Sequence, residues 1–515
     1  MFATTALWSA ASLTPAQAQT KPAQGAAAEV EEVVVVGSQI QGAKVNSALP
    51  VSVVNAEQIQ ATAAVSGDEL FRTIPQAGNV NFNSSFIPNS SNSARGDVNS
   101  VSLRNIGSGN TLVLLNGRRT IVHPTTQAES LVPVFTYNTN AIPVAGLKRV
   151  EVLRDGAGAI YGSDAVAGVI NTVLQDHYNG GMIDGQYGYA PGTSLREGSL
   201  NGLYGRDFQE GRGNFTIFAG TTRRSALLAS DQDFTAFADE RPLFADTPFA
   251  TATSLDFRST SSAWGVFQTV GTTGAVRSNG VAVTGTTGIF HVAPQTNPTC
   301  GVITAPGLCI NSGAQANTTT DRNLRLESAS FKLSMIPEVV RYNVFGTFNY
   351  DVTPDVQFFS EAGFYNAKTQ GTTIPPQVAS SAVITVPATG YYNPFGAALL
   401  PNGQPNPNRL PGLNIGAGGV PVTISTYAFV DAGATPVEVT NNQYRVLGGL
   451  RGKRFGFDWE TAALYTWATV KDLSYGVSAQ KAQQQASLTT PDAYNPFNGG
   501  SLGNPSYGDL TPSSA

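Results

Sequence analysis

The sequence predicts a compact α+β segment followed by an antiparallel transmembrane β-barrel. Three observations favour this fold class. Charged residues make up 13% of the chain, about half of the usual ~25%, and Gly is frequent at 54 of 515 residues. Short strand and helix patterns run to about residue 178, and period-two alternation follows them. In this second part, short connections alternate with long ones, which is typical of outer-membrane barrels.

Composition and charge exclude several other classes. A hydrophobic content of 41% and a net charge of −5 argue against a wholly disordered chain. The same acidic balance argues against a nucleic-acid-binding protein, so no nucleic acid is expected among the partners. No stretch approaches the ~18 consecutive apolar residues of a membrane-spanning helix, which excludes a helical membrane protein.

The first residues are similar to an export signal. A mostly apolar run ends in Ala16-Gln17-Ala18, which is an A-x-A cleavage pattern. No basic residue precedes Lys21, which a start upstream of Met1 would explain. We therefore expect residues 1–18 to be the remnant of a signal peptide. A disordered Ala-rich tail is the alternative.

A short acidic and valine-rich run comes next. It consists of Glu31, Glu32, Val33, Val34, Val35, Val36 and Gly37. Consecutive valines favour a strand, and no adjacent segment offers this strand a partner. Such an edge suits β-augmentation, in which another protein adds its own strand. On the residues alone, a first strand of the following domain is an equal alternative.

Residues 46–178 have the pattern of a compact α+β domain. Residues 50–54 predict a strand, and capping signals at Asn55 and Ser66 each predict the start of a short helix. Pro75 ends the second helix, and a loop rich in Asn and Ser follows. These signals together predict a compact α+β domain.

The second half of this domain contains the most distinctive motifs. Residues 111–115 predict a strand, and Asn116-Gly117 is the strongest short-range hairpin signal. In the run 147–171, a strand leads into a Gly-rich turn, then a small-residue segment and a second strand. The turn has the spacing G-x-G-x-x-x-G and lacks the P-loop Lys, so a nucleotide site is rejected in favour of close backbone packing. An Arg-Gly-Asp tripeptide at 95–97 is too short to indicate adhesion.

Taken together, these motifs resemble the plug domain of TonB-dependent outer-membrane receptors. The matching pieces are residues 31–37, 50–54, 103–107, 112–119 and 150–171. The resemblance covers about residues 31–178. It implies that residues 31–37 are the TonB box, which pairs with TonB of the inner-membrane energising complex. It therefore favours β-augmentation for this run.

The resemblance also implies a division of the chain and a set of site residues. We expect a flexible segment with the TonB box at 19–45, a plug at 46–178, and a partial barrel with long extracellular loops at 179–515. The plug motifs and the charges expected to contact the barrel wall are Arg104, Asn116, Gly117, Arg118, Arg119, Glu151, Arg154, Asp155, Gly156, Gly158, Tyr161 and Gly162. Simple surface exposure is the alternative for each charge.

Seven barrel strands are expected from the alternation. They lie near 181–190, 195–205, 213–225, 341–350, 355–366, 443–452 and 455–471. In the last of these, aromatic residues such as Phe457 and Trp459 alternate with polar ones such as Glu460. Family barrels of this kind have ~22 strands. We therefore expect an incomplete barrel in a chain truncated inside an extracellular loop.

Two features of the long loops produce further expectations. Cys300 and Cys309 are close in sequence, and an oxidising compartment would allow a disulfide between them. Nearby residues cannot complete a zinc shell, so no metal site is expected. An Asn-Pro-Phe motif occurs at 393–395 and again at 495–497. We favour turn formation with a packed Phe over stacking on a sugar.

The sequence contains no catalytic set, because His123, His177 and His291 are scattered and none pairs with a carboxylate at a useful spacing. An enzyme is therefore not expected, and neither is a cofactor. The family resemblance implies active, TonB-dependent import of a scarce, bulky solute into a Gram-negative cell across its outer membrane. Its expected partners are TonB, outer-membrane lipid and a small-molecule ligand. A ligand-sensing transducer, a passive porin or adhesin, and a secreted β-rich enzyme are the alternatives.

Overall fold

The computed structural model describes residues 51–78, 85, 96–125, 127–129, 132–154, 157–314, 324–327, 331–378 and 382–499. The predicted signal-peptide remnant, the TonB box at 31–37, Asp155 and Gly156 lie outside these residues. No helix in the described part is long and apolar enough to cross a membrane. The chain divides into two compact units, and each is described by itself.

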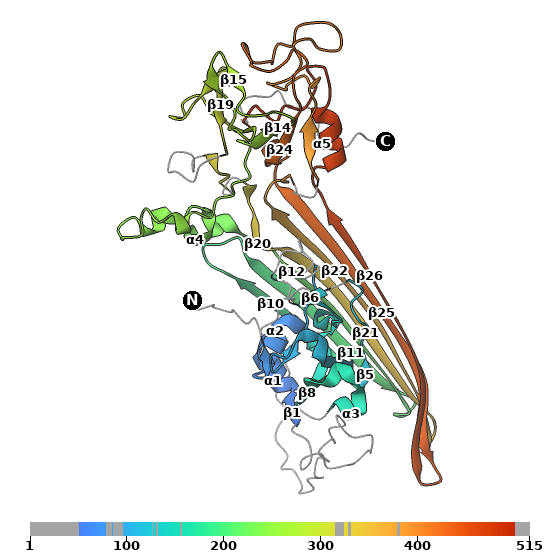
Figure 1. The fold of residues 1–515 in the computed structure, drawn as a ribbon. Coiled ribbons are helices and arrows are strands. Elements are labelled where there is room, and N and C mark those ends of the chain that lie inside the picture. Colours follow the sequence, from blue (N-terminus) through green and yellow to red (C-terminus); the bar gives the residue numbers. More distant parts are fainter. Residues whose placement is uncertain are drawn as a thin grey trace. The chain divides into compact units, whose positions relative to one another are not determined.

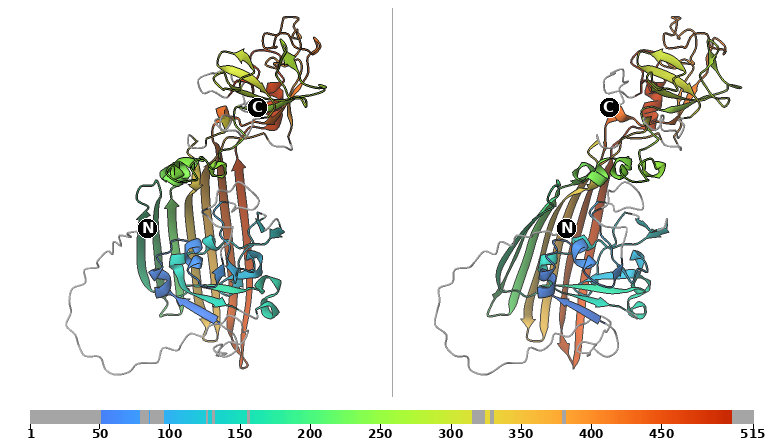
Figure 2. Two further views of the ribbon diagram at one scale, coloured as in Figure 1. Left: turned by 60° about the vertical axis from the view of Figure 1, so that its left-hand side comes forward. Right: turned by 90° about the vertical axis from the view of Figure 1, so that its left-hand side faces the viewer.

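The first unit comprises Met1–Leu228, Ser334–Gly371 and Val437–Leu473. It contains the plug, which we define as described residues 51–178, and a sheet of long strands that we call the wall. Figure 1 shows the plug elements in blue and cyan beside the long strands. The two views in Figure 2 place the plug against one face of the wall, where hydrogen bonds join them.

Five strands form the plug sheet, in the order β1-β8-β9-β4-β5. β4 and β9 are parallel, and the other neighbours are antiparallel. β1, which follows the N-terminal segment, is an edge strand paired with β8. The strands are β1 (Val51–Asn55), β4 (Thr111–Leu115), β5 (Arg118–Arg119), β8 (Leu147–Leu153) and β9 (Gly168–Leu174). Short pairs add β2 (Ala77–Gly78) with β3 (Ser102–Leu103), and β6 (Gln127–Glu129) with β7 (Val132–Val134).

The capping signals start the plug helices as predicted. Asn55 and Gln58 form a complete capping box at α1, because each side chain accepts a hydrogen bond from the other residue's backbone N–H. Ser66 accepts from the backbone N–H of Glu69 at the start of α2. The helices are α1 (Ala56–Ala61), α2 (Gly67–Arg72) and α3 (Gly158–Tyr161), with single turns η2 (Ser108–Asn110), η3 (Thr139–Ala141), η4 (Val144–Gly146) and η5 (Ser163–Ala165). Fully buried side chains such as Leu112, Val152 and Ile170 form the core between them.

The wall contains the seven long strands that the alternation predicts, in the order β10-β11-β12-β21-β22-β25-β26. Their bounds are β10 (Gly180–Tyr189), β11 (Arg196–Phe208), β12 (Gly213–Arg224), β21 (Glu338–Thr353), β22 (Val356–Thr373), β25 (Thr435–Arg454) and β26 (Phe457–Ser474). β10 and β26 are the two ends of this order, so the described sheet is open.

One turn differs from the sequence expectation. The sixth and seventh expected strands, 443–452 and 455–471, imply a turn around residues 452–454. In the structure, β25 continues to Arg454, and only Phe455 and Gly456 connect it to β26. Both residues have positive φ, 54° and 79°. Such φ values are those of the two-residue turns that match the twist of a hairpin, so the strands can be longer than the residue types suggest.

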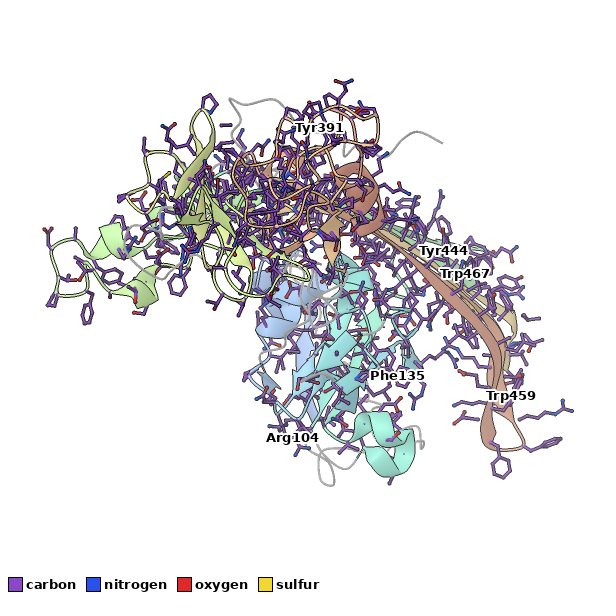
Figure 3. All side chains as sticks on the ribbon, turned by 45° about the horizontal axis from the view of Figure 1, so that its top comes forward. Arg104, Phe135, Tyr391, Tyr444, Trp459 and Trp467 are labelled. Carbon is purple, nitrogen blue, oxygen red and sulfur yellow. The ribbon has the colours of Figure 1, made fainter. Side chains whose placement is uncertain are left out.

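The alternation prediction for β26 is confirmed. Phe457 and Tyr465 are exposed on the wall, with 75% and 67% of their surfaces accessible. Glu460, on the other face, contacts the plug. Figure 3 shows Tyr444 of β25 beside Trp467 of β26, and their rings stack at 4.4 Å. The apolar side chains therefore face away from the plug, as a lipid-facing surface requires.

The second unit, which we call the loop unit, comprises Ala229–Leu333, Thr372–Pro436 and Ser474–Ala515. Its main sheet has the order β18-β19-β17-β14-β24-β23. The strands are β14 (Val266–Thr269), β17 (Ile289–Pro294), β18 (Val302–Ala305), β19 (Leu308–Ser312), β23 (Ile384–Val386) and β24 (Val422–Thr426), and the helices are α4 (Asp233–Ala236) and α5 (Ala479–Ala486). A smaller pair in this unit is β15 (Arg277–Ser278) with β16 (Val281–Ala282). The pair of β13 (Leu227–Leu228) with β20 (Ser334–Ile336) belongs to the first unit.

The loop unit has a core of its own. Phe267, Phe290, Tyr427 and Tyr494 are almost fully buried and come from three separate excursions of the chain. The sequence analysis described these excursions only as long loops. Their strands were missed because they are only two to six residues long, too short for alternation to show.

Candidate functional site: the contact between plug and wall

A buried ion pair joins the plug to the wall. Asp97 of the plug accepts two hydrogen bonds from Arg341 of β21, at 2.6 Å from Nε and 2.8 Å from Nη2. The carboxylate also accepts from the Tyr365 hydroxyl of β22 and from Asn140 Nδ2. Asp97 is fully buried and the Arg341 side chain is 5% exposed. A two-point guanidinium–carboxylate contact fixes orientation as well as distance, so it is the most specific joint between plug and wall.

The surroundings keep Asp97 ionised. Burial raises the pKa of Asp97, but the charge and hydrogen bonds of Arg341 and the hydrogen bond from Tyr365 lower it more, to below 3.8. Gly96 allows the close approach, because its φ is +71° and a Cβ there would lie 2.7 Å from Val439 on β25. Asp97 belongs to the Arg-Gly-Asp tripeptide, and its burial agrees with the rejection of an adhesion role.

A second joint involves Asn116. Its Nδ2 donates to Glu361 of β22 at 2.9 Å, and its Oδ1 accepts from the backbone N–H of Leu174 at 2.8 Å. Arg445 of β25 donates through Nε to the other oxygen of Glu361 at 3.1 Å. Asn116 has a φ of 51° and precedes Gly117, so the predicted hairpin turn presents its amide to the wall.

A third joint uses Arg118. Its guanidinium forms an ion pair with Glu460 of β26 and lies 5.6 Å from the ring centroid of Phe359. Arg451 contacts the same ring at 5.2 Å. These groups are partly exposed, and exposed ion pairs contribute only ~0–1 kcal/mol, so this joint is the weaker one.

Several predicted residues act inside the plug. Arg119 forms an ion pair with Asp164, and only its backbone carbonyl accepts from the wall, from Arg445 Nη1 at 3.5 Å. The hydrogen bond that Arg119 donates to Asp164 is the main cause that raises the pKa of Arg119. Glu151 is fully buried, and Arg149 and Asn171 of the plug donate to its carboxylate at 2.7 Å and 2.9 Å. Thus Glu151 is a structural residue of the plug sheet rather than the wall contact expected from the sequence.

The remaining predicted residues lie around the Gly-rich turn. Arg104 is exposed and its Nη2 donates to the Val166 carbonyl at 3.3 Å, within the plug. Arg154 is half-buried after β8. Gly158 and Tyr161 begin and end α3, and Gly162 terminates the helix with a φ of +90°. Gly117 donates its backbone N–H to Asn171 at 2.8 Å.

The sequence analysis missed the residues of the wall that hold the plug. Arg341, Glu361, Tyr365 and Arg445 are the important ones. These residues could have been found from the sequence, because each carries a charged or hydroxyl group on the plug-facing side of a strand that is otherwise rich in apolar residues. The joint with Asp97 had no signal in the sequence, because an acidic residue in a loop rich in Asn and Ser is usually solvated.

The expected disulfide is not present in the structure. Cys300 and Cys309 are free thiols, and Cys309 is buried. Burial, followed by a hydrogen bond with Cys300, raises the pKa of Cys309 to about 12. The two thiols are therefore neighbours in the loop unit, and their oxidation to a disulfide stays a prediction. Among the described residues, no group of three or more His, Cys, Asp or Glu side chains is placed to hold a metal.

The turn interpretation of the Asn-Pro-Phe motifs is confirmed. Asn393 accepts from the backbone N–H of Phe395 at 2.9 Å, and Asn495 accepts from that of Phe497 at 3.0 Å. Both phenyl rings pack on Phe290, with centroids 4.9 Å and 6.3 Å away. The motif is therefore a repeated turn that inserts a Phe into the core of the loop unit.

Comparison with known proteins agrees with this architecture. The model of the TonB-dependent Receptor Plug Domain matches residues 43–169. The vitamin B12 transporter BtuB of Photobacterium profundum is 28% identical over 176 residues, which cover 33% of this chain and 24% of that protein. The ferric enterobactin receptor PirA of Pseudomonas aeruginosa is 31% identical over 164 residues, which cover 30% of this chain and 20% of that protein.

Among solved structures, a mutant of the ferric enterobactin receptor PfeA from Pseudomonas aeruginosa is 14% identical, with a TM-score of 0.36. The match covers 82% of this chain and 49% of that one. The matched region thus spans no more than a quarter of the curated relatives named above. The plug model and the matching relatives show that residues 43–169 are similar to the plug domain of TonB-dependent receptors.

Proposed function

We propose that this chain serves TonB-dependent active transport of a scarce, bulky solute across the outer membrane. The observation that carries this proposal is the plug held on the inner face of the wall by the buried pair of Asp97 and Arg341. A wide barrel is not selective when it is empty, so a folded domain on its inner face has the role of a gate.

The same proposal assigns roles to the parts of the chain. Residues 31–37 pair with TonB as an added strand, within a flexible segment at 19–45. The plug extends over 46–178, and residues 179–515 supply barrel strands and extracellular loops. Force on the box reaches β1 first, because β1 follows this segment and is the edge strand of the plug sheet.

The solute belongs to the siderophore, vitamin or carbohydrate type. Two matching relatives are named for vitamin B12 and for ferric enterobactin, which supports the first two types. The ligand binds to the outer loops and the plug. Charged residues of the plug such as Arg118 hold the plug at the wall, here by an ion pair with Glu460, until energy is supplied.

The experiment is a deletion of Val33–Val36 in the full-length gene. Uptake of radiolabelled ferric enterobactin, vitamin B12 and an oligosaccharide is measured with and without a proton-motive force, at equal surface expression. The expected result is loss of the energy-dependent uptake of whichever solute the receptor takes. Deletion of Pro22–Gly25, which has the same length and lies outside the box, is the matched control. Unchanged uptake after the first deletion would sink the assignment of the box.

A further inference from the structure

A half-open cavity lies between the plug and the wall. It has a volume of about 60 Å³, several times the ~10–15 Å³ that one water molecule needs, so a small polar group fits inside and a larger body extends through the open side. Six plug residues line one side, and nine residues of β21, β22, β25 and β26 line the other. Much of this lining is apolar, including Leu115, Ile142 and Phe345.

Two hydrogen-bond donors in this cavity are unused. Arg445 is 7% exposed, and its Nη2 has no hydrogen-bond partner among the described residues. The same is true of Nε2 of Gln443, two positions earlier on β25 and therefore on the same face of the strand. The other nitrogens of Arg445 are occupied by Glu361 and by the Arg119 carbonyl. A buried donor without a partner costs ~1–3 kcal/mol, so an acceptor at this place is favoured.

Three other polar lining residues are already used within the protein. Asn343 Nδ2 donates to the Ala141 carbonyl at 3.0 Å, and the Tyr365 hydroxyl donates to Asp97. Asn138 Oδ1 accepts from the backbone N–H groups of Asn99 and Asn140. Among the lining residues of the described chain, Arg445 carries the only formal charge, and none is acidic. The cavity therefore offers two unused donors against apolar walls, and the charge of Arg445 is shared with its ion-pair partner Glu361.

This chemistry suits one class of ligand. A buried water makes ~3 hydrogen bonds and could accept from both unused donors, but it would leave the apolar lining without a partner. A carboxylate only accepts, and an ionised acceptor forms the stronger bond with a guanidinium. Leu115 and Phe345 would pack against the carbon body that carries the carboxylate.

We propose that the cavity between plug and wall is a binding site for a carboxylate on an apolar body, held by Arg445 and Gln443. It lies within the contact that a solute must cross when the plug opens. In this respect the inference rests on the proposed transport function, which would supply the carboxylate as part of the solute. Binding itself requires no transport and can be measured separately.

The test is a titration of the full-length receptor in detergent micelles, followed by fluorine NMR. The probe is 4-fluorobenzoate, and 4-fluorobenzyl alcohol is its uncharged counterpart. The first variant combines Arg445→Gln with Glu361→Gln, so that no buried charge is left without a partner. Ala141→Leu fills the cavity from the plug side without changing any charge, and Gln443→Leu removes the second donor alone. Arg454→Gln, at an exposed position on the same strand and outside the cavity lining, is the matched control.

The expected result is saturable binding of 4-fluorobenzoate to the wild type and to Arg454→Gln with the same Kd. The double variant and Ala141→Leu should each weaken binding at least about tenfold, and Gln443→Leu at least about threefold. Equal binding of the alcohol, no binding to the wild type, or unchanged binding to the cavity variants would overturn the proposal and leave a cavity that holds water only. If uptake depends on the TonB box but 4-fluorobenzoate does not bind, the proposed carboxylate site is refuted and the transport proposal stands. If 4-fluorobenzoate binds but no energy-dependent uptake is found, the transport proposal is refuted and the site stands.

Discussion

Replacing Asp97 with Asn tests the idea that one buried ion pair holds the plug to the wall. Asp97 is fully buried and Arg341 is 5% exposed, so the substitution removes the close counter-charge of the guanidinium and leaves only Glu197, 4.0 Å from Nη1, as its ion-pair partner. Breaking a buried pair in this way costs about 3–5 kcal/mol. Asp164→Asn is the matched control, because its pair with Arg119 is 38–48% exposed and should contribute only about 0–1 kcal/mol.

The assay is amide hydrogen exchange of β8 and β9 in the full-length receptor, converted to a free energy of opening. Asp97→Asn should lower this free energy several-fold more than Asp164→Asn does. Adding Arg341→Met to Asp97→Asn should restore part of the loss, because the double variant has no buried charge left unpaired. A loss within 1 kcal/mol of the control, or no recovery in the double variant, would refute the reasoning.

Three further predictions concern pH, the cysteines and the loop unit. Burial lowers the pKa of His123 from 6.5 to about 4. The free energy of unfolding of the plug should therefore decrease by up to about 3 kcal/mol as the pH falls from 6.5 toward 4. In His123→Gln, this pH dependence of the stability measured by hydrogen exchange should disappear. Oxidation of Cys300 and Cys309 to a disulfide closes a ten-residue loop and should stabilise the folded loop unit by about 3 kcal/mol in the chain-entropy model. Peptide mapping without reductant should find the two linked peptides. Two free thiols in protein from the cell surface would contradict the disulfide. Phe395→Ala should destabilise the loop unit by about 3–5 kcal/mol, because the phenyl ring is fully buried. Phe249→Ala, at a site that is 60% exposed, should leave the stability unchanged. Limited proteolysis compares the two variants, and equal resistance to protease would contradict a shared core.

The sequence predicted the elements whose signals are local. The capping box at Asn55, the Asn116-Gly117 turn and the alternation of β26 each depend on residues a few positions apart. These signals were sufficient for the plug elements and for all seven wall strands.

Contacts between distant residues could not be predicted in this way. Asp97 and Arg341 are 244 positions apart, and nothing near either residue indicates the other. Glu151 shows that a local signal can also mislead. A charged residue was expected to contact the wall, whereas two side chains of the plug itself donate hydrogen bonds to its carboxylate inside the plug core. The loop unit was missed for a related reason, since its core is assembled from three separated segments, each of which looks like a loop by itself.

The most direct test of the central claim, that the plug must move relative to the wall for uptake, is a reversible tether. A Cβ added at Gly146 of the plug would lie 3.5 Å from Cβ of Phe218 on β12, within the ~3.5–4.5 Å that a disulfide requires. The Gly146→Cys/Phe218→Cys receptor, with both native cysteines replaced by Ser, is assayed for energy-dependent uptake before and after reduction. The account predicts no uptake while the tether is oxidised and recovery when it is reduced. Full uptake by the oxidised receptor would contradict it.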